Sequence, residues 1–456
     1  MRSIVAILPR GEAIRNFAYN GVLRRINQRL SVRVLSVIPC EVVHKALRLS
    51  GSEIEQLTDL GMPWIMRYVY KIMDMAHGRM IWSRAAEERW KNRDRESRVR
   101  QKQIRRWVNK VVAILFAHRV GLSLLERILL ILYRFNRKPQ VIAYYDRVQP
   151  VLVFNGSHVH CMIAVPYLLE ARLRRIPIAS FLFSWDNLTS QGRIIPQSRY
   201  YLAWNRHIQQ QLLNMYPNCR QEHTVAVGTP QFDIHQVEPS ISKTDFMTLH
   251  GLLPSRPVVL YTSGMPNHMP GEPEIVRNIA DLFSFISPKP QMALRVYGKD
   301  RTGRFDSLKK HPDIVFMPDY WEPSYHTPLP EDDSHYAHLL RYCDVGINIA
   351  STVSLELMMY DKPVINVAYQ ATGEMPPVPF RSFYDFDHYK PLVESGAVSL
   401  VEHEEDMKDA LKRALDEPNQ LAYQRAHLLQ SFFDPQLDGH AGDRIAHQIA
   451  TWAEAL

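Results

Sequence analysis

Short apolar runs rich in β-branched residues recur along the 456-residue chain, with segments of helical spacing between them. These runs occupy residues 3–8, 32–38, 151–154, 178–183, 225–227, 258–262, 292–297, 314–317, 345–349 and 364–368. Strands without polar alternation are typical of parallel sheets that helices cover on both faces. The pattern therefore predicts an α/β protein, and a chain of this length is expected to form two domains or more.

The alternation stops between about residues 61 and 138, where tryptophan, arginine and apolar residues recur at helical spacing. Ile104, Val108 and Leu115 fall on one face of such a helix. This segment predicts two or three long helices inserted into the first domain. Between Arg89 and Lys110 there are ten Lys or Arg residues against two acids, and this excess of eight equals the net charge of +8 of the whole chain.

The basic helices of this insertion favour contact with an anionic surface. Trp82, Trp90 and Trp107 lie beside positive charges, which suits an anionic membrane. The same pattern suits RNA, and it also suits a solvated helical hairpin that packs its apolar face on its own domain. We favour the membrane, through Arg89 to Lys110, over nucleic acid, because the helix has a broad Leu/Ile face and no RNA-binding motif accompanies it.

The cysteines and the apolar segments favour a cytoplasmic protein. Cys40, Cys161, Cys219 and Cys343 are scattered with no CxxC pair, which predicts neither a zinc site nor a disulfide framework. The first apolar run is short for a signal peptide and lacks a cleavage site, so a strand is expected there. No run reaches the roughly 20 uncharged residues that span a bilayer. We therefore expect a peripheral protein on the inner face of the membrane.

Residues 347–368 predict one strand–helix–strand unit. Ser351 and Thr352 follow the first strand, and Glu356 lies about one turn into the helix. The amides at such a helix start attract anions, and a carboxylate one turn further on can reach ribose hydroxyls. On spacing alone, helix capping by Ser351 and Thr352 is the preferred interpretation, with Glu356 as an ordinary first-turn acid.

Polar residues also follow three strands of the first domain, at the sheet edge where α/β proteins bind ligands. They are Gly11, Glu12 and Arg15 after residues 3–8, Asn155 after residues 151–154, and Trp185, Asp186 and Asn187 after residues 178–183. Asp186 is a candidate general base because it is a carboxylate at the carboxyl end of a buried strand. Its alternative role is to hold loop amides together with Asn187. An ordinary solvated turn equally explains the first group.

Three candidates lie at strand ends of the second domain. Gly264 is in the turn after residues 258–262, and Arg295 and Lys299 lie at the end of the next strand. Either cation can neutralise a diphosphate, and the alternative is plain surface charge.

No metal site is predicted. The acids at residues 331–333, with His335 close by, are expected to be solvated. His158 and His160 lack a further ligand at the right spacing, so a structural role is expected for both.

Four motifs carry a resemblance to a known superfamily. The sequence STVSLELMMYDKPVI from residue 351 resembles the nucleotide-binding turn and helix of GT-B glycosyltransferases. SWDNLTSQG from residue 184, VGTPQFD from residue 227 and DGHAGDRIAHQIA from residue 438 resemble the surface-carbohydrate biosynthesis branch, which is related to CDP-glycerol glycerophosphotransferases. The resemblance covers most of the chain except the insertion.

This resemblance implies a GT-B fold with two Rossmann-like domains. The first, 1–236, is the acceptor domain and carries the insertion; the second, 237–456, is the donor domain, with a final helix that can pack back on the first. In the relatives the Ser/Thr turn faces the donor diphosphate and the glutamate faces its ribose, which assigns Ser351, Thr352 and Glu356 to the donor. The relatives' R-x-H-P-like segment is replaced here by residues 295–300, without the histidine.

We therefore expect a metal-independent glycosyltransferase without a cofactor. It moves a sugar from a nucleotide-activated donor to a surface polysaccharide or lipid-linked glycan, with Asp186 as first and Glu12 as second candidate base. A CDP-glycerol-type polyol-phosphate transferase is the near alternative, weakened by the absent histidine. A nucleotide-sugar 2-epimerase is not favoured, because the expected catalytic acids cannot be matched. The alternative of another class is a non-catalytic, membrane-recruited nucleotide-binding scaffold.

Overall fold

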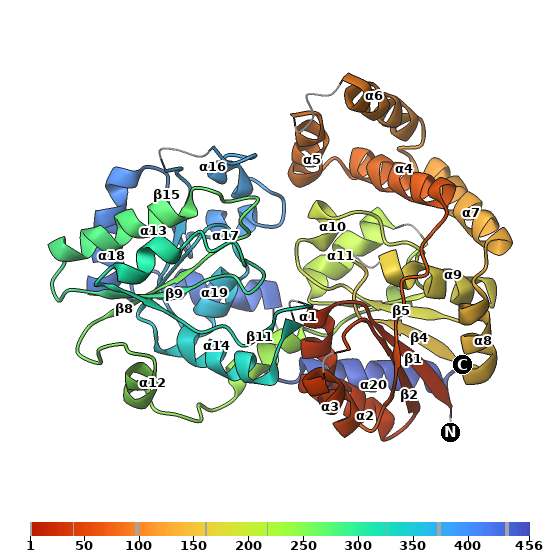
Figure 1. Cartoon of the computed structure of the whole chain (residues 1–456), viewed down its shortest axis with the longest axis horizontal. Helices are drawn as coiled ribbons and strands as arrows, with labels where there is room; N and C mark the ends of the chain where they lie inside the picture. The colour runs from red at the N-terminus through yellow and green to blue at the C-terminus, as the bar shows by residue number, and fades with distance from the viewer. Residues whose placement is uncertain are drawn as a thin grey trace. The chain divides into compact units, whose positions relative to one another are not determined.

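The computed structural model describes residues 2–39, 41–95, 100–159, 162–216, 218–325, 327–371, 375–433 and 437–456. Cys40, His160, Cys161 and part of the basic segment 89–110 lie outside these ranges. The chain divides into two compact units (Figure 1). Unit 1 comprises Met1–Asp233 and Gln436–Leu456, and unit 2 comprises Ile234–Pro435.

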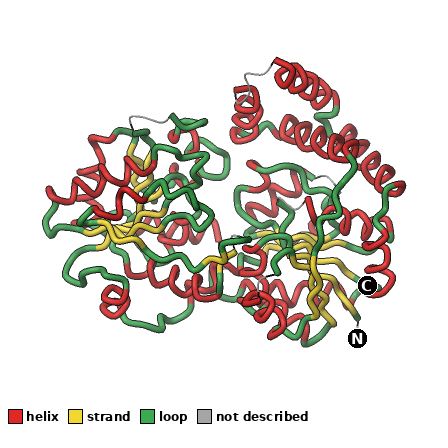
Figure 2. Tube along the Cα trace, viewed as in Figure 1, coloured by secondary structure: helices red, strands yellow, loops and turns green. Residues whose placement is uncertain are grey.

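Unit 1 is built on a parallel seven-stranded sheet (Figure 2). Its strands in spatial order are β3 (Glu53–Gln56), β2 (Ser31–Ser36), β1 (Ser3–Leu8), β4 (Leu152–Asn155), β5 (Ile178–Phe181), β6 (Tyr200–Ala203) and β7 (Thr224–Ala226). Neighbouring strands pair in parallel, with Ile4 of β1 opposite Val32 of β2 and Leu152 of β4. The chain order reverses direction between β1 and β4, which makes this point the switch point of the sheet.

Helices cover the sheet because its strands carry apolar side chains on both faces. Tyr145 and Leu168, from two of these helices, pack in one buried cluster with Val5 and Val153 of the strands. The helices of this layer arrangement are α1 (Gly11–Ile14), the π-helical turn Arg15–Tyr19, α2 (Val22–Asn27), α3 (Glu41–Leu49), α8 (Pro139–Val148), α9 (Val165–Leu173), α10 (Asn187–Ser190), α11 (Arg206–Met215) and α20 (Ala441–Glu454).

The insertion contains four helices in its described part, where two or three were expected. They are α4 (Trp64–Ile81), α5 (Arg84–Arg95), α6 (Arg100–Leu115) and α7 (Arg119–Phe135). Met73 and Leu129 pack in a buried cluster with Val165 and Leu169 of α9. The insertion is therefore anchored on unit 1 through α4 and α7.

The C-terminal helix α20 belongs to unit 1. It packs against α2, and Trp452 stacks on Tyr200 of β6 with ring centroids 4.5 Å apart. Asp233 accepts hydrogen bonds from the backbone N–H groups of Ala441 (3.1 Å) and Gly442 (2.8 Å). The VGTPQFD and DGHAGDRIAHQIA motifs thus meet within one unit, and the aspartate of the first supports the start of the helix in the second.

Unit 2 holds a parallel six-stranded sheet with the same winding. Its strands in spatial order are β10 (Ile314–Phe316), β9 (Gln291–Arg295), β8 (Val258–Thr262), β13 (Val345–Asn348), β14 (Val364–Val367) and β15 (Ser399–Val401). A short antiparallel pair, β11 (Trp321–Glu322) and β12 (Thr327–Pro328), lies apart from it. The switch point lies between β8 and β13. Two doubly wound parallel sheets confirm the predicted fold class.

The helices of unit 2 bury the apolar faces of this sheet. Val259, Ile347 and Ile365 of the strands share one core with Ile275 and Leu411 of the helices. The helices are α12 (Lys243–Leu249), α13 (Glu272–Asp281), α14 (Pro330–Tyr342), α15 (Val353–Met358), α16 (Phe380–Phe383), α17 (Lys390–Glu394), α18 (Met407–Asp416) and α19 (Ala422–Phe433).

Candidate nucleotide site in unit 2

The turn that follows β13 leaves the sheet at its switch point. Ala350 has a φ of +43°, a left-handed conformation that costs energy for a residue with a Cβ. Its backbone N–H donates to the Tyr384 hydroxyl at 3.1 Å, and the Ser351 N–H donates to Asn348 Oδ1 at 3.1 Å. The side chains of Tyr384 and Asn348 thus hold this turn in a shape that the local sequence alone does not favour.

A buried polar network lies directly beneath the turn. Asn348 Oδ1 also accepts from Ser354 Oγ and from Asn366 Nδ2, both at 3.1 Å. The Tyr389 hydroxyl donates to Asn366 Oδ1 at 3.0 Å and lies 2.9 Å from Ser354 Oγ. Burial raises the pKa of Tyr389. Because these neutral groups hydrogen-bond to one another, the network fixes the turn without a buried charge.

Ser351 and Thr352 occupy the turn as the sequence predicted. The Ser351 hydroxyl accepts from the Val353 N–H at 3.3 Å, whereas Thr352, the N-cap residue of α15, makes no side-chain capping hydrogen bond. A hydroxyl that accepts one bond can still donate its proton to an anionic oxygen. Capping and phosphate binding are therefore compatible at Ser351.

Glu356 lies one turn into α15, and each of its carboxylate oxygens has a hydrogen-bond partner that orients it. Oε1 lies 3.2 Å from Nε2 of His235, and Oε2 accepts from the Tyr336 hydroxyl at 2.9 Å. The Tyr360 hydroxyl lies 3.0 Å from the other ring nitrogen of His235. Since each carboxylate oxygen has more than one acceptor site, the fixed carboxylate remains able to accept hydrogen bonds from a vicinal diol.

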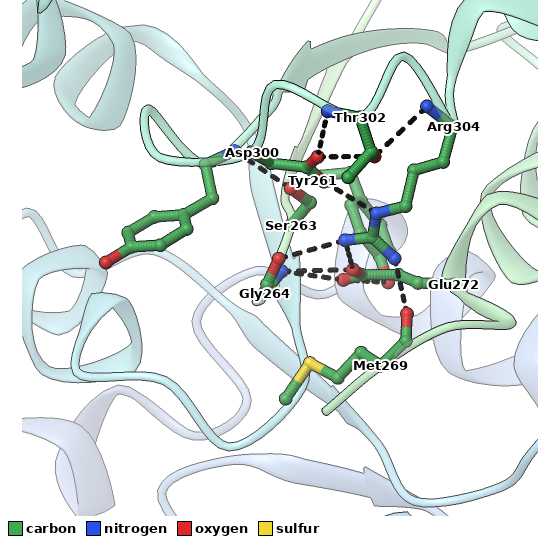
Figure 3. A network of polar contacts seen from close by, with 9 residues as sticks. Tyr261, Ser263, Gly264, Met269, Glu272, Asp300, Thr302 and Arg304 are labelled. Carbon is green, nitrogen blue, oxygen red and sulfur yellow. Dashed lines mark hydrogen bonds and ion pairs between the residues drawn. The ribbon is translucent and has the colours of Figure 1, made fainter. Parts of the chain in front are cut away.

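The loop after β8, on the other side of the switch point, is held by a buried ion-pair cluster (Figure 3). Glu272 is fully buried, accepts two hydrogen bonds from the Gly264 N–H at 3.0 and 3.1 Å, and pairs with Arg304 at 2.8 Å. Burial raises the pKa of Glu272, against the effect of the Arg304 charge. Arg304 also donates to the Gly264 carbonyl at 2.9 Å and to Asp300 at 2.6 Å.

This cluster gives Gly264 a structural role, because its N–H and its carbonyl both have partners within the loop. Burial alone would raise the pKa of Asp300, but hydrogen bonds from Thr302 and Arg304 hold it below its usual range. The loop is thereby fixed beside the turn after β13, and donor binding by Gly264 stays a prediction.

Arg295 and Lys299 both lie near Trp321. Arg295 is buried and pairs with the buried Asp332 at 2.5 Å. Asp332 further accepts from the Tyr320 N–H at 2.9 Å and from the Trp321 indole at 2.8 Å. Asp332, which was expected to be solvated, is therefore the partner of Arg295. The Lys299 ammonium lies 6.0 Å from the centre of the Trp321 ring.

In unit 1, the candidates after β1 form part of a short helix and a π-helical turn. Gly11 is buried, and Glu12 pairs with Arg10 at 3.0 Å. Arg15 donates to Gln231 Oε1 at 3.3 Å. These contacts orient the polar side chains of the turn. Whether the turn binds a ligand or is an ordinary solvated turn was open from the sequence and stays a prediction.

The candidates after β4 and β5 lie at the same edge of the sheet in unit 1. Asn155 is buried at the last position of β4, and Trp185 is buried after β5. Asp186 accepts from the Ser190 hydroxyl at 2.5 Å and from Asn187 Nδ2 at 3.2 Å. Asn187 Oδ1 accepts from the Ser184 N–H at 2.8 Å. Both side chains thus hold their loop, as in the alternative role considered for them.

Sequence reasoning did not identify the residues that orient Glu356 and support the turn. Asn348 and Asn366 are polar positions inside two apolar strands, and that contrast is a usable signal. His235, Tyr336 and Tyr384 lie at distant chain positions with no shared motif, so nothing in the sequence links them to Glu356 or to Ala350.

Within the described ranges, no group of three or more His, Cys, Asp or Glu side chains is placed to hold a metal ion. In the same part of the chain, no helix is both long and apolar enough to cross a membrane.

No protein-family model and no curated protein sequence matches this chain. Solved structures do match. MnaA from S. aureus, solved with UDP, has a TM-score of 0.57 at 13% identity, with 100% of this chain and 98% of that chain covered. The UDP-GlcNAc 2-epimerase from Neisseria meningitidis, bound to UDP-GlcNAc, has a TM-score of 0.54 at 13% identity over 99% of this chain and 100% of that chain.

A third match is Alr3699/HepE from Anabaena in complex with UDP-glucose, with a TM-score of 0.52 at 13% identity over 100% of both chains. At these identities the likeness shows the fold alone. The chain has the GT-B fold, which UDP-GlcNAc 2-epimerases share with glycosyltransferases.

Proposed function

We propose that this chain is a glycosyltransferase that binds a nucleoside-diphosphate sugar in unit 2. One observation carries the proposal: the carboxylate of Glu356 lies one helical turn beyond the turn after β13. His235 and Tyr336 hold that carboxylate in place. The carboxylate and the turn both lie at the switch point, where doubly wound sheets bind nucleotides. The solved neighbours described with UDP, UDP-GlcNAc and UDP-glucose support the same class of ligand.

In the proposed complex, Glu356 accepts hydrogen bonds from the two ribose hydroxyls. The hydroxyls of Ser351 and Thr352 donate to the diphosphate, and Lys299 supplies positive charge. In the transfer step, an acceptor oxygen forms a bond to the anomeric carbon while the bond from that carbon to the diphosphate breaks. The diphosphate leaves with the electron pair, and the proton of the acceptor hydroxyl passes to a base.

We propose that the acceptor is a surface polysaccharide or a lipid-linked glycan and that a carboxylate takes up the acceptor proton. Asp186 and Glu12 are the candidates, because their carboxylates follow strands β5 and β1 at the carboxyl edge of the seven-stranded sheet. If one of them is the base, Asp186→Asn or Glu12→Gln abolishes turnover while UDP affinity is unchanged.

The donor site is tested by titration calorimetry with UDP. A Glu356→Gln variant loses charge-assisted hydrogen bonds to ribose, each worth about 1.5–3 kcal/mol, so binding weakens by about tenfold or more. Glu394→Gln, on the exposed side of α17 in the same unit, is the matched control and binds UDP like the unchanged protein. Equal affinity in the Glu356→Gln variant would exclude this site.

A second candidate function is 2-epimerisation of a UDP-sugar, which the similarity to solved UDP-GlcNAc 2-epimerases favours. NMR of the chain with UDP-GlcNAc separates the candidates. Transfer releases UDP only when an acceptor is present, whereas epimerisation changes the sugar at C2 without an acceptor. Release of CMP from CDP-glycerol would instead support the polyol-phosphate transferase, and binding without turnover would support the scaffold.

A further inference from the structure

Helix α6 turns its apolar stripe away from the rest of unit 1. Its buried residues are Asn109 and Ala113, on the side that contacts α4. Its exposed large apolar side chains are Ile104, Trp107, Val108, Val111, Ile114 and Leu115. Their spacing of three and four residues places them on one face, and Trp107 and Leu115 are each 66% exposed. A helix of a globular domain normally packs such a stripe on the core.

The charges of α6 identify what this stripe contacts. The helix sequence RQKQIRRWVNKVVAIL contains five Lys or Arg residues and no acid. An apolar face flanked by cations is the pattern of a helix that lies in the interface of a bilayer with anionic lipids. A second copy of this chain would have to place these positive charges against those of an identical helix across a symmetric contact.

Two other tryptophans of the insertion, Trp82 and Trp90, pack on its own cations. The rings of Trp82 and Trp90 lie 5.9 Å apart. Arg79 lies 4.2 Å from the centre of the Trp82 ring, and Lys110 lies 5.2 Å from that of Trp90. These contacts stabilise the insertion internally, so the exposed tryptophan of the apolar stripe is Trp107.

We propose that α6 docks unit 1 onto an anionic bilayer. The helix lies parallel to the surface, its six exposed apolar side chains enter the boundary between headgroups and acyl chains, and Arg100 and Arg105 face the lipid phosphates. This proposal does not depend on the reaction that the protein catalyses.

Sedimentation of the full chain with vesicles tests the proposal. Binding is expected to vesicles of phosphatidylcholine with phosphatidylserine and to weaken with added salt, which screens the lipid charge. The double variant Trp107→Gln/Leu115→Gln is expected to bind at least about tenfold more weakly. The control Tyr423→Gln/Leu249→Gln, which changes two side chains exposed by 77% and 71% in unit 2, keeps full binding. Melting curves check that both variants are folded.

A second measurement locates the contact. Vesicle addition is expected to shift the tryptophan emission to the blue, and Trp107→Phe is expected to remove that shift while sedimentation persists. Failure of the unchanged protein to bind acidic vesicles, or equal binding by the double variant, overturns the proposal. The unchanged protein could instead form a dimer or bind RNA without binding vesicles. If the double variant then lost that dimer or that RNA binding, the stripe would contact another partner, and the membrane proposal would equally be overturned.

Discussion

Asn348 is the residue on which the candidate nucleotide turn depends. Its side-chain oxygen accepts from the Ser351 N–H, from Ser354 and from Asn366, and all of these contacts are buried or nearly so. A single oxygen therefore connects the end of β13, the start of α15 and the middle of β14. The turn keeps its left-handed Ala350 because this connection holds the residues on either side.

An Asn348→Ala variant is expected to lose about 2–3 kcal/mol of unfolding free energy in unit 2, because buried donors are left without an acceptor. UDP affinity should fall with it, since the turn is no longer held. Urea unfolding and calorimetry measure the two effects. The control is Asn278→Ala on α13, which removes a solvent-exposed hydrogen bond to Glu404 and should cost less than about 1 kcal/mol. Equal losses in the two variants would contradict this role of Asn348.

Arg295 poses a different question, because its charge already has the buried partner Asp332. Arg295→Met leaves that carboxylate without its cation and is expected to cost about 3–5 kcal/mol of stability. The double variant Arg295→Met/Asp332→Asn should recover much of this loss.

The double variant also decides whether Arg295 binds the donor. If the charge serves the fold, the stabilised double variant binds UDP within about threefold of the unchanged protein. A much larger loss of affinity, with stability restored, would assign Arg295 to the diphosphate after all.

At the level of elements, the insertion is coupled to the sheet of unit 1 through α4. His77 of α4 is fully buried, with its ring nitrogen 3.4 Å from the Tyr216 hydroxyl. Ser83, just beyond α4, donates to the Thr189 carbonyl, and Arg89 of α5 donates to the Gln191 carbonyl at 3.2 Å. The helices thus hold the SWDNLTSQG loop in place, which is a role that their charge pattern did not suggest.

His77 makes this coupling dependent on pH. Burial, together with the charges of Arg193 and Arg89, lowers its pKa from 6.5 to about 3. His77 therefore takes up a proton near pH 6.5 in the unfolded chain but only near pH 3 in the folded chain. Stability from this group is complete above pH 6.5 and falls as the pH drops, by about 2 kcal/mol at pH 5.

Melting temperatures at pH 7.5 and pH 5 test this effect. His77→Phe should show a smaller difference between the two conditions than the unchanged protein does. His447→Phe, on the exposed side of α20, should leave the difference unchanged. An unaltered pH dependence in the His77 variant would show that acid destabilisation arises elsewhere.

The sequence predicted the strands well because most are buried on both faces and therefore carry runs of apolar residues. It missed two edge strands: β3, a polar strand whose residues are exposed or half-buried, and β15, which has only three residues. It also predicted an apolar face on α6, but periodicity cannot tell whether such a face points inward or outward. Ser351 and Glu356 became donor candidates through the resemblance to GT-B glycosyltransferases, because their spacing alone favoured helix capping. His235 and Tyr336 reach Glu356 only through the folding of unit 2.

At the scale of the whole molecule, the proposed nucleotide binding and the proposed membrane docking belong to different units. The candidate nucleotide-binding residues lie in unit 2, and the outward stripe of α6 lies in unit 1. Substitutions at separate sites that share no partner act independently. The Trp107→Gln/Leu115→Gln variant should therefore bind UDP normally, and Glu356→Gln should bind vesicles normally. Calorimetry and sedimentation on both variants measure this, and a reciprocal loss would reveal coupling between the units.

The path of the chain has a consequence for how the protein is made. Unit 1 receives its final helix α20 only after the whole of unit 2 has been synthesised, because residues 437–456 follow it in the sequence. Domains tend to fold in the order in which they leave the ribosome. Here the first unit to begin is the last to be completed: until α20 emerges, α2 and Tyr200 lack their packing partner, and Asp233 lacks the two amides that it binds.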